Sequence, residues 1–175
     1  VDPHAWNDVR RSARPLDLAL LQPPPTSSTA SRYHMLREFL GAPEGTVHWG
    51  ALALGLPFRR AFQDTLAKRV KASLDSRELP GTVILAGQTA VGKSVALAML
   101  ASGYARSGKA AVLHHSWRSD RPEWEHIDSY SQWVEAHGDV PLIFVWDGML
   151  PPAQYEGMAA RLRSPCWVRS GASIP

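Results

Sequence analysis

The sequence predicts a three-layer α/β fold in which a parallel β-sheet is flanked by helices on both faces. Two apolar runs, residues 82–86 and 140–147, have the unbroken hydrophobicity of strands that are covered on both sides. The segment 95–106 that follows the first run is rich in Ala and Leu, which favours a helix. Strands that alternate with helices along the chain are typical of a parallel sheet.

The composition is that of an ordinary globular domain and argues against two classes of partner. The chain has 175 residues, of which 45% are hydrophobic and 20% are charged, enough for one domain with a substantial core. The net charge of +3 comes without a dense run of Lys and Arg, so a nucleic-acid partner is not indicated. No apolar run approaches the roughly 20 residues of a membrane span, so we expect no membrane partner.

The cellular compartment is predicted from the use of cysteine. Cys166 is the single cysteine of the chain, so an internal disulfide cannot form and a reducing compartment is favoured. The chain begins with Val1 and shows no signal-peptide pattern, as expected of a fragment or a processed piece. We therefore expect a cytoplasmic location.

The N-terminal part of the chain carries fewer signals than the rest. Residues 1–45 are expected to form an N-terminal segment with a linker rich in Pro and Ser at 23–29. Within this segment, residues 31–40 predict a short helix with Ser31 as its N-cap. The remaining residues, 46–175, are predicted to form the domain that contains the sheet and to be truncated at the C-terminus.

The region before the first strand predicts a long amphipathic helix from Pro57 to Ser76. Proline is tolerated in the first turn of a helix, where its missing N–H would have no partner. Apolar residues recur every four positions along this stretch and define one buried stripe. The stripe consists of Phe58, Phe62, Leu66, Val70 and Leu74.

An eight-residue loop between the strand 82–86 and the following helix fits the pattern G-x-x-x-x-G-K-[ST] at every fixed position. We expect Gly87 and Gly92 to adopt φ values that other residues rarely reach, so that consecutive N–H groups turn inward. These N–H groups and the positive end of the helix would form a cradle for phosphate. The candidate nucleotide-binding residues of the loop are Gly87, Gln88, Thr89, Ala90, Val91, Gly92, Lys93 and Ser94.

Two side chains of this loop add specific chemistry. Lys93 supplies a mobile positive charge that suits the β- and γ-phosphates of a nucleoside triphosphate. Ser94 offers a hydroxyl to a magnesium ion that bridges two phosphates. The loop therefore predicts a nucleoside triphosphate site of the Walker A kind.

Residues 110–117 predict a second strand, and residues 122–137 predict a helix with an apolar stripe. The adjacent His114 and His115 invite interpretation as metal ligands. However, neighbouring residues of a strand point to opposite faces, so these two imidazoles cannot easily share one ion. A metal role for this pair is therefore not favoured.

The strand 140–147 ends in Asp147, which is the pattern known as Walker B. An acid at the carboxyl end of such a strand can hold magnesium directly or through water. Lys93 and Asp147 are therefore the predicted catalytic residues, and Ser94 and Asp147 are the predicted metal-binding residues.

Features beyond Asp147 leave the prediction incomplete. Gly148 stands where many ATPases have a water-activating acid, and the next acid, Glu156, falls on an expected helix at 152–163, so no general base is assigned. Residues 166–170 predict a further strand. Either the chain is truncated inside the fold, or a segment from residues 1–50 completes the sheet.

From Trp49 to Trp146 the layout resembles the STAND class of P-loop ATPases, which are signal-transduction switches related to AAA+ proteins. The resemblance rests on the Walker A and Walker B matches and on the stretch Gly55-Leu56-Pro57-Phe58-Arg59-Arg60, followed by an amphipathic helix. In that family this stretch packs near the adenine, which implies Arg59 and Arg60 as nucleotide-binding residues. The resemblance also implies a P-loop NTPase sheet and ATP and Mg²⁺ as ligands. As partners it implies other domains of a longer parent protein, or further copies of the chain, in bacterial signalling or defence.

The sequence leaves three functions open. The first is an ATP-binding switch that hydrolyses ATP slowly. The second is a small-molecule kinase that uses the same phosphate cradle, with residues 117–125 as part of a lid; a GTPase is not favoured because no N-K-x-D is present. The third is a non-catalytic interaction module whose nucleotide site is vestigial.

Overall fold

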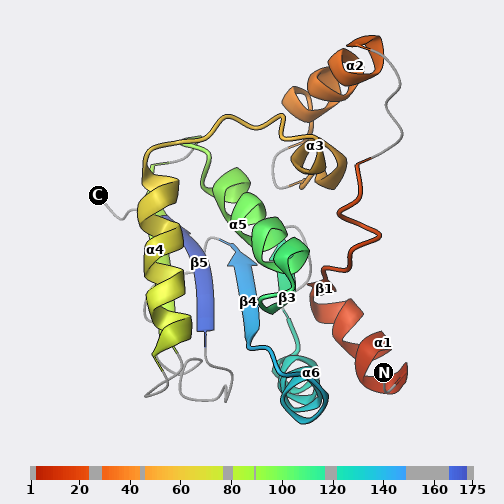
Figure 1. Ribbon diagram of the computed structural model, residues 1–175, viewed down its shortest axis with the longest axis vertical. Coiled ribbons are helices and arrows are strands. Elements are labelled where there is room, and N and C mark those ends of the chain that lie inside the picture. Colours follow the sequence, from red (N-terminus) through yellow and green to blue (C-terminus); the bar gives the residue numbers. More distant parts are fainter. Residues whose placement is uncertain are drawn as a thin grey trace.

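The computed structural model describes residues 3–23, 29–43, 46–76, 81–88, 90–116, 122–148 and 166–172, the last range for its backbone. These residues form a mixed α/β structure with a five-stranded sheet and six helices, four of which cover the faces of the sheet (Figure 1). Within the described residues, no helix combines the length and the apolar character needed to cross a bilayer. The expected helix at 152–163, with Glu156, lies outside the described residues.

The strands of the sheet lie in the order β1-β3-β4-β5-β2. Their bounds are β1 (Arg14–Pro15), β2 (Gly81–Gly87), β3 (Ala111–Ser116), β4 (Leu142–Asp147) and β5 (Cys166–Ala172). Strands β2, β5, β4 and β3 are parallel, whereas β1 pairs antiparallel with β3 at the edge of the sheet. The carboxyl ends of the four parallel strands therefore lie along one edge of the sheet, where ligands bind in open α/β folds.

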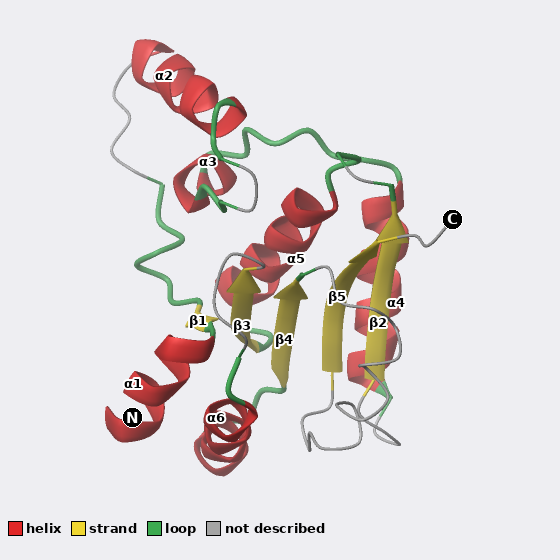
Figure 2. Cartoon of the chain, turned by 180° about the vertical axis from the view of Figure 1, so that it is seen from behind, coloured by secondary structure: helices red, strands yellow, loops and turns green. Residues whose placement is uncertain are grey.

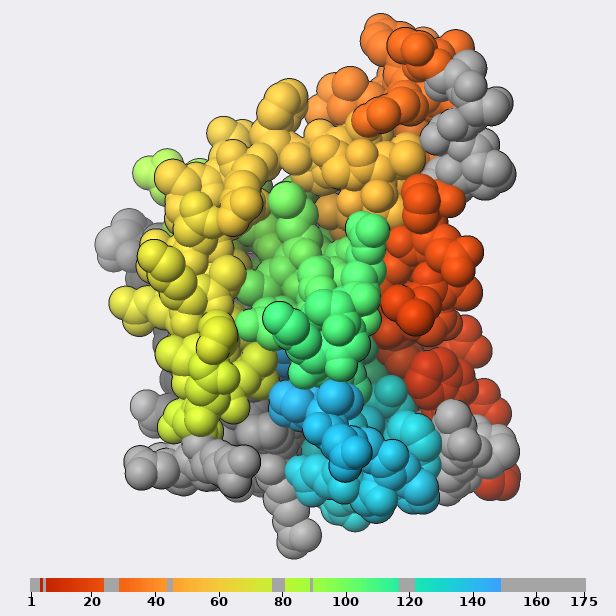
Figure 3. Space-filling model, viewed as in Figure 1, coloured from red at the N-terminus to blue at the C-terminus, as the bar shows by residue number. Residues whose placement is uncertain are grey.

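The helices are divided between the two faces of this sheet (Figure 2). Their bounds are α1 (Pro3–Ser12), α2 (Thr29–Leu40), α3 (Trp49–Ala53), α4 (Phe62–Asp75), α5 (Lys93–Ser107) and α6 (Trp124–His137). Helices α4 and α5 pack on one face of the sheet, and α1 and α6 pack on the other. Helices α2 and α3 lie beyond the sheet (Figure 1). Helix α3 packs against α5 through Trp49 and Leu52, whereas α2 projects from one end of the molecule (Figure 3).

Strand β4 is the centre of the core and is buried along its whole length. Phe144 and Trp146 point to the face covered by α1 and α6, and Ile143 and Val145 point to the face covered by α4 and α5. This confirms the prediction of a strand that is covered on both sides, because side chains alternate between the faces of a sheet.

Strand β2 forms where it was predicted, but it is not the fully buried strand that its apolar sequence indicated. Its residues alternate between half-buried and exposed, and the side chain of Ile84 is 54% exposed. The reason is its position at the end of the strand order, where Val83 and Leu85 pack toward α4 and α5. An apolar sequence predicts a strand well, but it does not predict whether helices cover one face of that strand or both.

The predicted starts of α4 and α2 differ from the observed ones in ways that change the role of single residues. Helix α4 starts at Phe62 rather than at Pro57, and the side chain of Phe58 is 77% exposed instead of joining the apolar stripe. Residues before Phe62 are held by polar contacts, including a hydrogen bond from the Arg60 N–H to Gln63 Oε1 at 3.1 Å. Helix α2 starts at Thr29, so Ser31 lies inside the helix and is not its N-cap.

Helix α1 was not predicted, although its sequence carries a weak signal. Trp6, Val9 and Ala13 are spaced at helical intervals, and they pack against the helix α6 and the strands beneath it. Directly after α1, β1 pairs with β3, and the Leu16 N–H donates to the carbonyl of Val112 at 2.9 Å. Residues 1–50 therefore contribute one short strand, β1, to the sheet, which was one of the two alternatives that the sequence left open.

Candidate functional site

The predicted phosphate loop connects the carboxyl end of β2 with the first residue of α5. Gly92 is the N-cap of α5 and has φ 87°, in the left-handed region that favours glycine. Its special φ was therefore predicted correctly. Gly87 is the last residue of β2 and lies outside that region, so the same expectation was wrong for it, because the chain is still a regular strand there.

Ala90 is the unexpected residue of this loop. Its φ of 65° also lies in the left-handed region, which costs a residue with a Cβ roughly 1–2 kcal/mol. Left-handed residues in a short loop turn backbone N–H groups to one side, and such concave arrangements bind anions. Strain of this kind persists where the surrounding structure holds it, commonly at a ligand site. No sequence signal marks Ala90, because alanine carries no preference for this conformation.

Lys93 folds back over its own loop. Its ammonium group donates to the carbonyl oxygens of Gly87 at 2.7 Å and Gln88 at 2.6 Å. An ammonium has three N–H donors; two are used within the loop, and the third has no partner among the described residues and is open to an anion placed there. Thr89, the remaining residue of the loop, lies outside the described residues.

Ser94 lies in the first turn of α5 and faces the N-terminal part of the chain. It lines a small cavity of about 30 Å³ together with Thr46, Val47 and His48, which precede α3. The residues before α3 therefore cover the beginning of the phosphate-loop helix. Sequence reasoning missed this contact, since the stretch carries no recognisable motif.

Asp147 is the last residue of β4 and is only 3% exposed. It shares a strand face with Ile143 and Val145, which pack in the same cluster as Leu97 of α5. Because α5 begins at the carboxyl edge of the sheet, Asp147 and Ser94 lie at the same edge and on the same face. One strand, β5, separates β4 from β2, so the lateral distance between the backbones of β2 and β4 is about 10 Å.

The two histidines of β3 lie on opposite faces, as predicted. His114 meets Trp49 edge-on with 5.2 Å between ring centroids, and His115 packs against Trp146 at 5.7 Å. Within the described residues, no group of three or more His, Cys, Asp or Glu side chains is arranged to hold a metal.

Both imidazoles are neutral at physiological pH. Burial lowers the pKa of His114 to about 4; the charge of Asp147 opposes this shift, and His115 and Arg14 add to it. Burial also lowers the pKa of His115, against the opposing effects of its hydrogen bond to the Ser12 carbonyl and of Asp147. The carboxylate of Asp147 thus has no protonated imidazole beside it.

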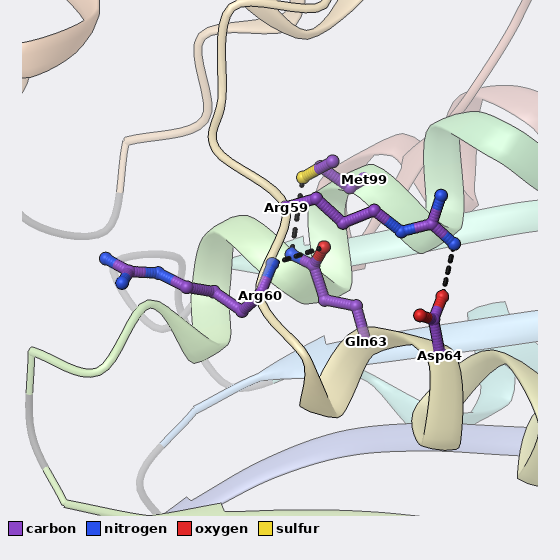
Figure 4. A network of polar contacts seen from close by, with 5 residues as sticks. All are labelled: Arg59, Arg60, Gln63, Asp64 and Met99. Carbon is purple, nitrogen blue, oxygen red and sulfur yellow. Dashed lines mark hydrogen bonds and ion pairs between the residues drawn. The ribbon is translucent and has the colours of Figure 1, made fainter.

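Arg59 and Arg60 lie in the segment that connects α3 with α4, which passes the beginning of α5 (Figure 1). Arg59 forms an ion pair with Asp64 in the first turn of α4. The guanidinium of Arg60 extends in the opposite direction (Figure 4). Gln63, in the first turn of α4, accepts a hydrogen bond from the Arg60 N–H. Its Nε2 in turn contacts the sulfur of Met99 in α5 at 3.4 Å, which links this segment to α5. Arg59 is therefore engaged with α4, and Arg60 is the better placed of the two to reach a ligand.

No family model matches the chain, and no curated protein matches it in sequence at a significant level. The function is therefore inferred from the residues and their geometry.

Proposed function

We propose that the chain is a Mg²⁺-dependent ATP-binding module that hydrolyses ATP slowly and acts as a nucleotide switch in a larger signalling or defence protein. We further propose that its sheet is of the P-loop NTPase type and that it belongs with the STAND class. The observation that carries the proposal is the loop between β2 and α5. In this loop Ala90 and Gly92 are left-handed, and the Lys93 ammonium lies over the loop carbonyls.

The loop residues have a defined role in this proposal. The N–H groups that the left-handed residues turn inward, with the positive end of α5, hold the phosphate chain. Lys93 keeps one N–H for a phosphate oxygen while its other two hold the loop closed. Arg60, whose guanidinium extends away from α4, would border the base or the sugar in this proposal.

The residues present fit a magnesium ion. Ser94 offers a hydroxyl and Asp147 a carboxylate, both at the carboxyl edge and on the α5 face of the sheet. Two oxygen ligands from the protein are usual for magnesium, which takes the rest of its ligands from phosphate and water. When bound, the ion would neutralise charge on the phosphates.

Slow hydrolysis follows from the position after Asp147. A Cβ added at Gly148 would lie 2.6 Å from the indole nitrogen of Trp146, closer than side chains tolerate. The Trp146 ring cannot easily move away, because it packs against Trp124 at 5.4 Å and against His115. A water-activating acid is therefore excluded from this position by packing, and hydrolysis lacks a general base there.

The proposal is tested by equilibrium binding of labelled ATP in the presence of magnesium. Lys93→Ala should weaken binding by roughly 10- to 100-fold, because a charge-assisted hydrogen bond to phosphate is worth about 1.5–3 kcal/mol. The matched control is Lys109→Ala, an exposed lysine beyond the opposite end of α5, which should bind ATP as the unchanged chain does. Equal affinity of the unchanged chain and Lys93→Ala would refute the phosphate-loop assignment.

A further inference from the structure

A second cavity lies between the end of α1, strand β1 and the carboxyl end of β3. We call it the arginine cavity, because Arg10, Arg11 and Arg14 line it together with Ser12 and His114. Its volume of about 510 Å³ lies in the range of small-molecule sites. The three arginines are exposed, whereas Ser12 and His114 are 3% and 4% exposed. The cavity thus has a charged mouth and a buried polar floor.

The backbone that carries the arginines is held rigidly by contacts to Ser12. The Ser12 hydroxyl accepts a hydrogen bond from the Glu123 N–H at 2.9 Å, and the Ser12 carbonyl accepts one from His115 Nδ1 at 2.6 Å. Arg14 is fixed by strand pairing, directly opposite His114. Arginines placed by such a scaffold lose less conformational entropy on binding than arginines on a mobile loop.

Arginines dominate the charge at the mouth of the arginine cavity, and the nearby acid Asp147 lies buried behind His114. Among the described residues that line it, none is acidic. The nearest ion pair, between Arg11 and Asp8, spans 4.0 Å between exposed side chains and contributes little. Arg10 rests over the ring of Trp6 at 5.9 Å and keeps its charge. Three guanidinium groups at one mouth repel each other and attract an anion.

His114 supplies a second, independent indication of a ligand. It lines the cavity and is almost completely buried, and its Nε2 has no hydrogen-bond partner within the described residues. A buried polar atom without a partner costs about 1–3 kcal/mol. An oxygen-bearing ligand in the cavity is the simplest partner for such an atom.

We propose that the arginine cavity binds a small molecule that carries a phosphate or diphosphate group. Arginine forks match the geometry of phosphate oxygens better than any other side chain does. The arginine cavity adjoins the small cavity that includes Ser94, since Thr46 and Val47 line both, but no described residue of the loop 87–94 lines the arginine cavity, so it is a separate site. The inference therefore goes beyond the proposed function and does not depend on it.

The test uses the full chain with Lys93→Ala, which weakens the phosphate loop, and pyrophosphate as the probe in isothermal titration at constant ionic strength. We expect saturable binding that weakens at least tenfold when Arg11→Gln and Arg14→Gln are added. The matched control adds Arg32→Gln and Arg37→Gln, which remove the same charge from exposed positions on α2. Its affinity should stay within about twofold of the Lys93→Ala chain, which is the scatter expected for exposed charges that are largely screened.

Two outcomes would overturn the arginine cavity as a phosphate site. One is the absence of saturable pyrophosphate binding in the Lys93→Ala chain. The other is an equal loss of affinity in the α2 control, which would mean that the weaker pyrophosphate binding comes from the lower net charge and not from the arginine cavity. Circular dichroism of each variant establishes that it is folded, and Arg14→Lys, which keeps the charge but loses the fork, should still weaken binding.

Discussion

Strands β4 and β2 have similar apolar sequences but opposite surroundings. All six residues of β4 are buried between two helical layers, whereas β2 alternates between half-buried and exposed residues at the end of the strand order. Each strand ends in a predicted functional element: β4 in Asp147, and β2 in the phosphate loop. The acid therefore ends a fully buried interior strand, and the loop follows a more exposed strand.

The largest expected effect on stability comes from replacing an isoleucine by alanine in β4, and the same change in β2 provides the comparison. Ile143→Ala in β4 removes a fully buried side chain and should lower the free energy of unfolding by about 2–5 kcal/mol. Ile84→Ala in β2, where the side chain is 54% exposed, should cost less than about 1 kcal/mol. Urea denaturation of the two variants measures both values. Equal losses would contradict the contrast between the strands.

Strand β3, which pairs with β4, contains a buried histidine that should make the stability of the chain depend on pH. The pKa of His114 is about 4 in the folded chain and 6.5 in the unfolded chain, so below pH 6.5 the unfolded chain binds more protons. Stability should therefore fall from pH 6.5 to pH 4, by about 3 kcal/mol from this residue, and should be independent of it above pH 6.5.

The check is the pH dependence of the free energy of unfolding, measured for two glutamine variants. His114→Gln should flatten the fall between pH 6.5 and pH 4. His34→Gln changes an exposed histidine of α2 and should leave the fall intact. If both variants retained the same slope, His114 would not be the source of the acid sensitivity.

Replacing alanine by glycine should stabilise the chain in the phosphate loop and destabilise it in a helix. Ala90→Gly relieves the left-handed φ of 65° and should stabilise the chain by about 0.5–1 kcal/mol. Ala67→Gly, at an exposed position inside α4, should destabilise it by about 1 kcal/mol. Thermal unfolding of both variants gives the two signs, and a loss of stability in Ala90→Gly would remove the evidence for strain in the loop.

Much of the sheet could be predicted from the sequence, because continuous apolar runs and the Gly-Lys-Ser pattern are local signals. The strands that became β2, β3, β4 and β5 were all placed correctly to within about two residues, the usual uncertainty of element ends. The exposure of β2 was not predicted, since strand order depends on contacts between distant segments. The pairing of Arg14 with His114 was also missed, because a two-residue strand leaves no pattern.

The candidate site was predicted in part for the same reason. The left-handed φ of Gly92 follows from its residue type, whereas that of Ala90 arises from the path of the loop. The position of Asp147 on the α5 face follows from strand alternation once β4 is known. The cover of Ser94 by residues 46–48 depends on tertiary packing and has no local signal.

The most direct measurement is the change in the free energy of unfolding on addition of Mg-ATP. At a concentration of about one hundred times the dissociation constant, a ligand that binds only the folded chain adds about 2.7 kcal/mol. We predict this gain for the unchanged chain and its loss in Lys93→Ala at the same ATP concentration. The absence of a gain in the unchanged chain, or an equal gain in both, would contradict a phosphate loop that holds a nucleoside triphosphate.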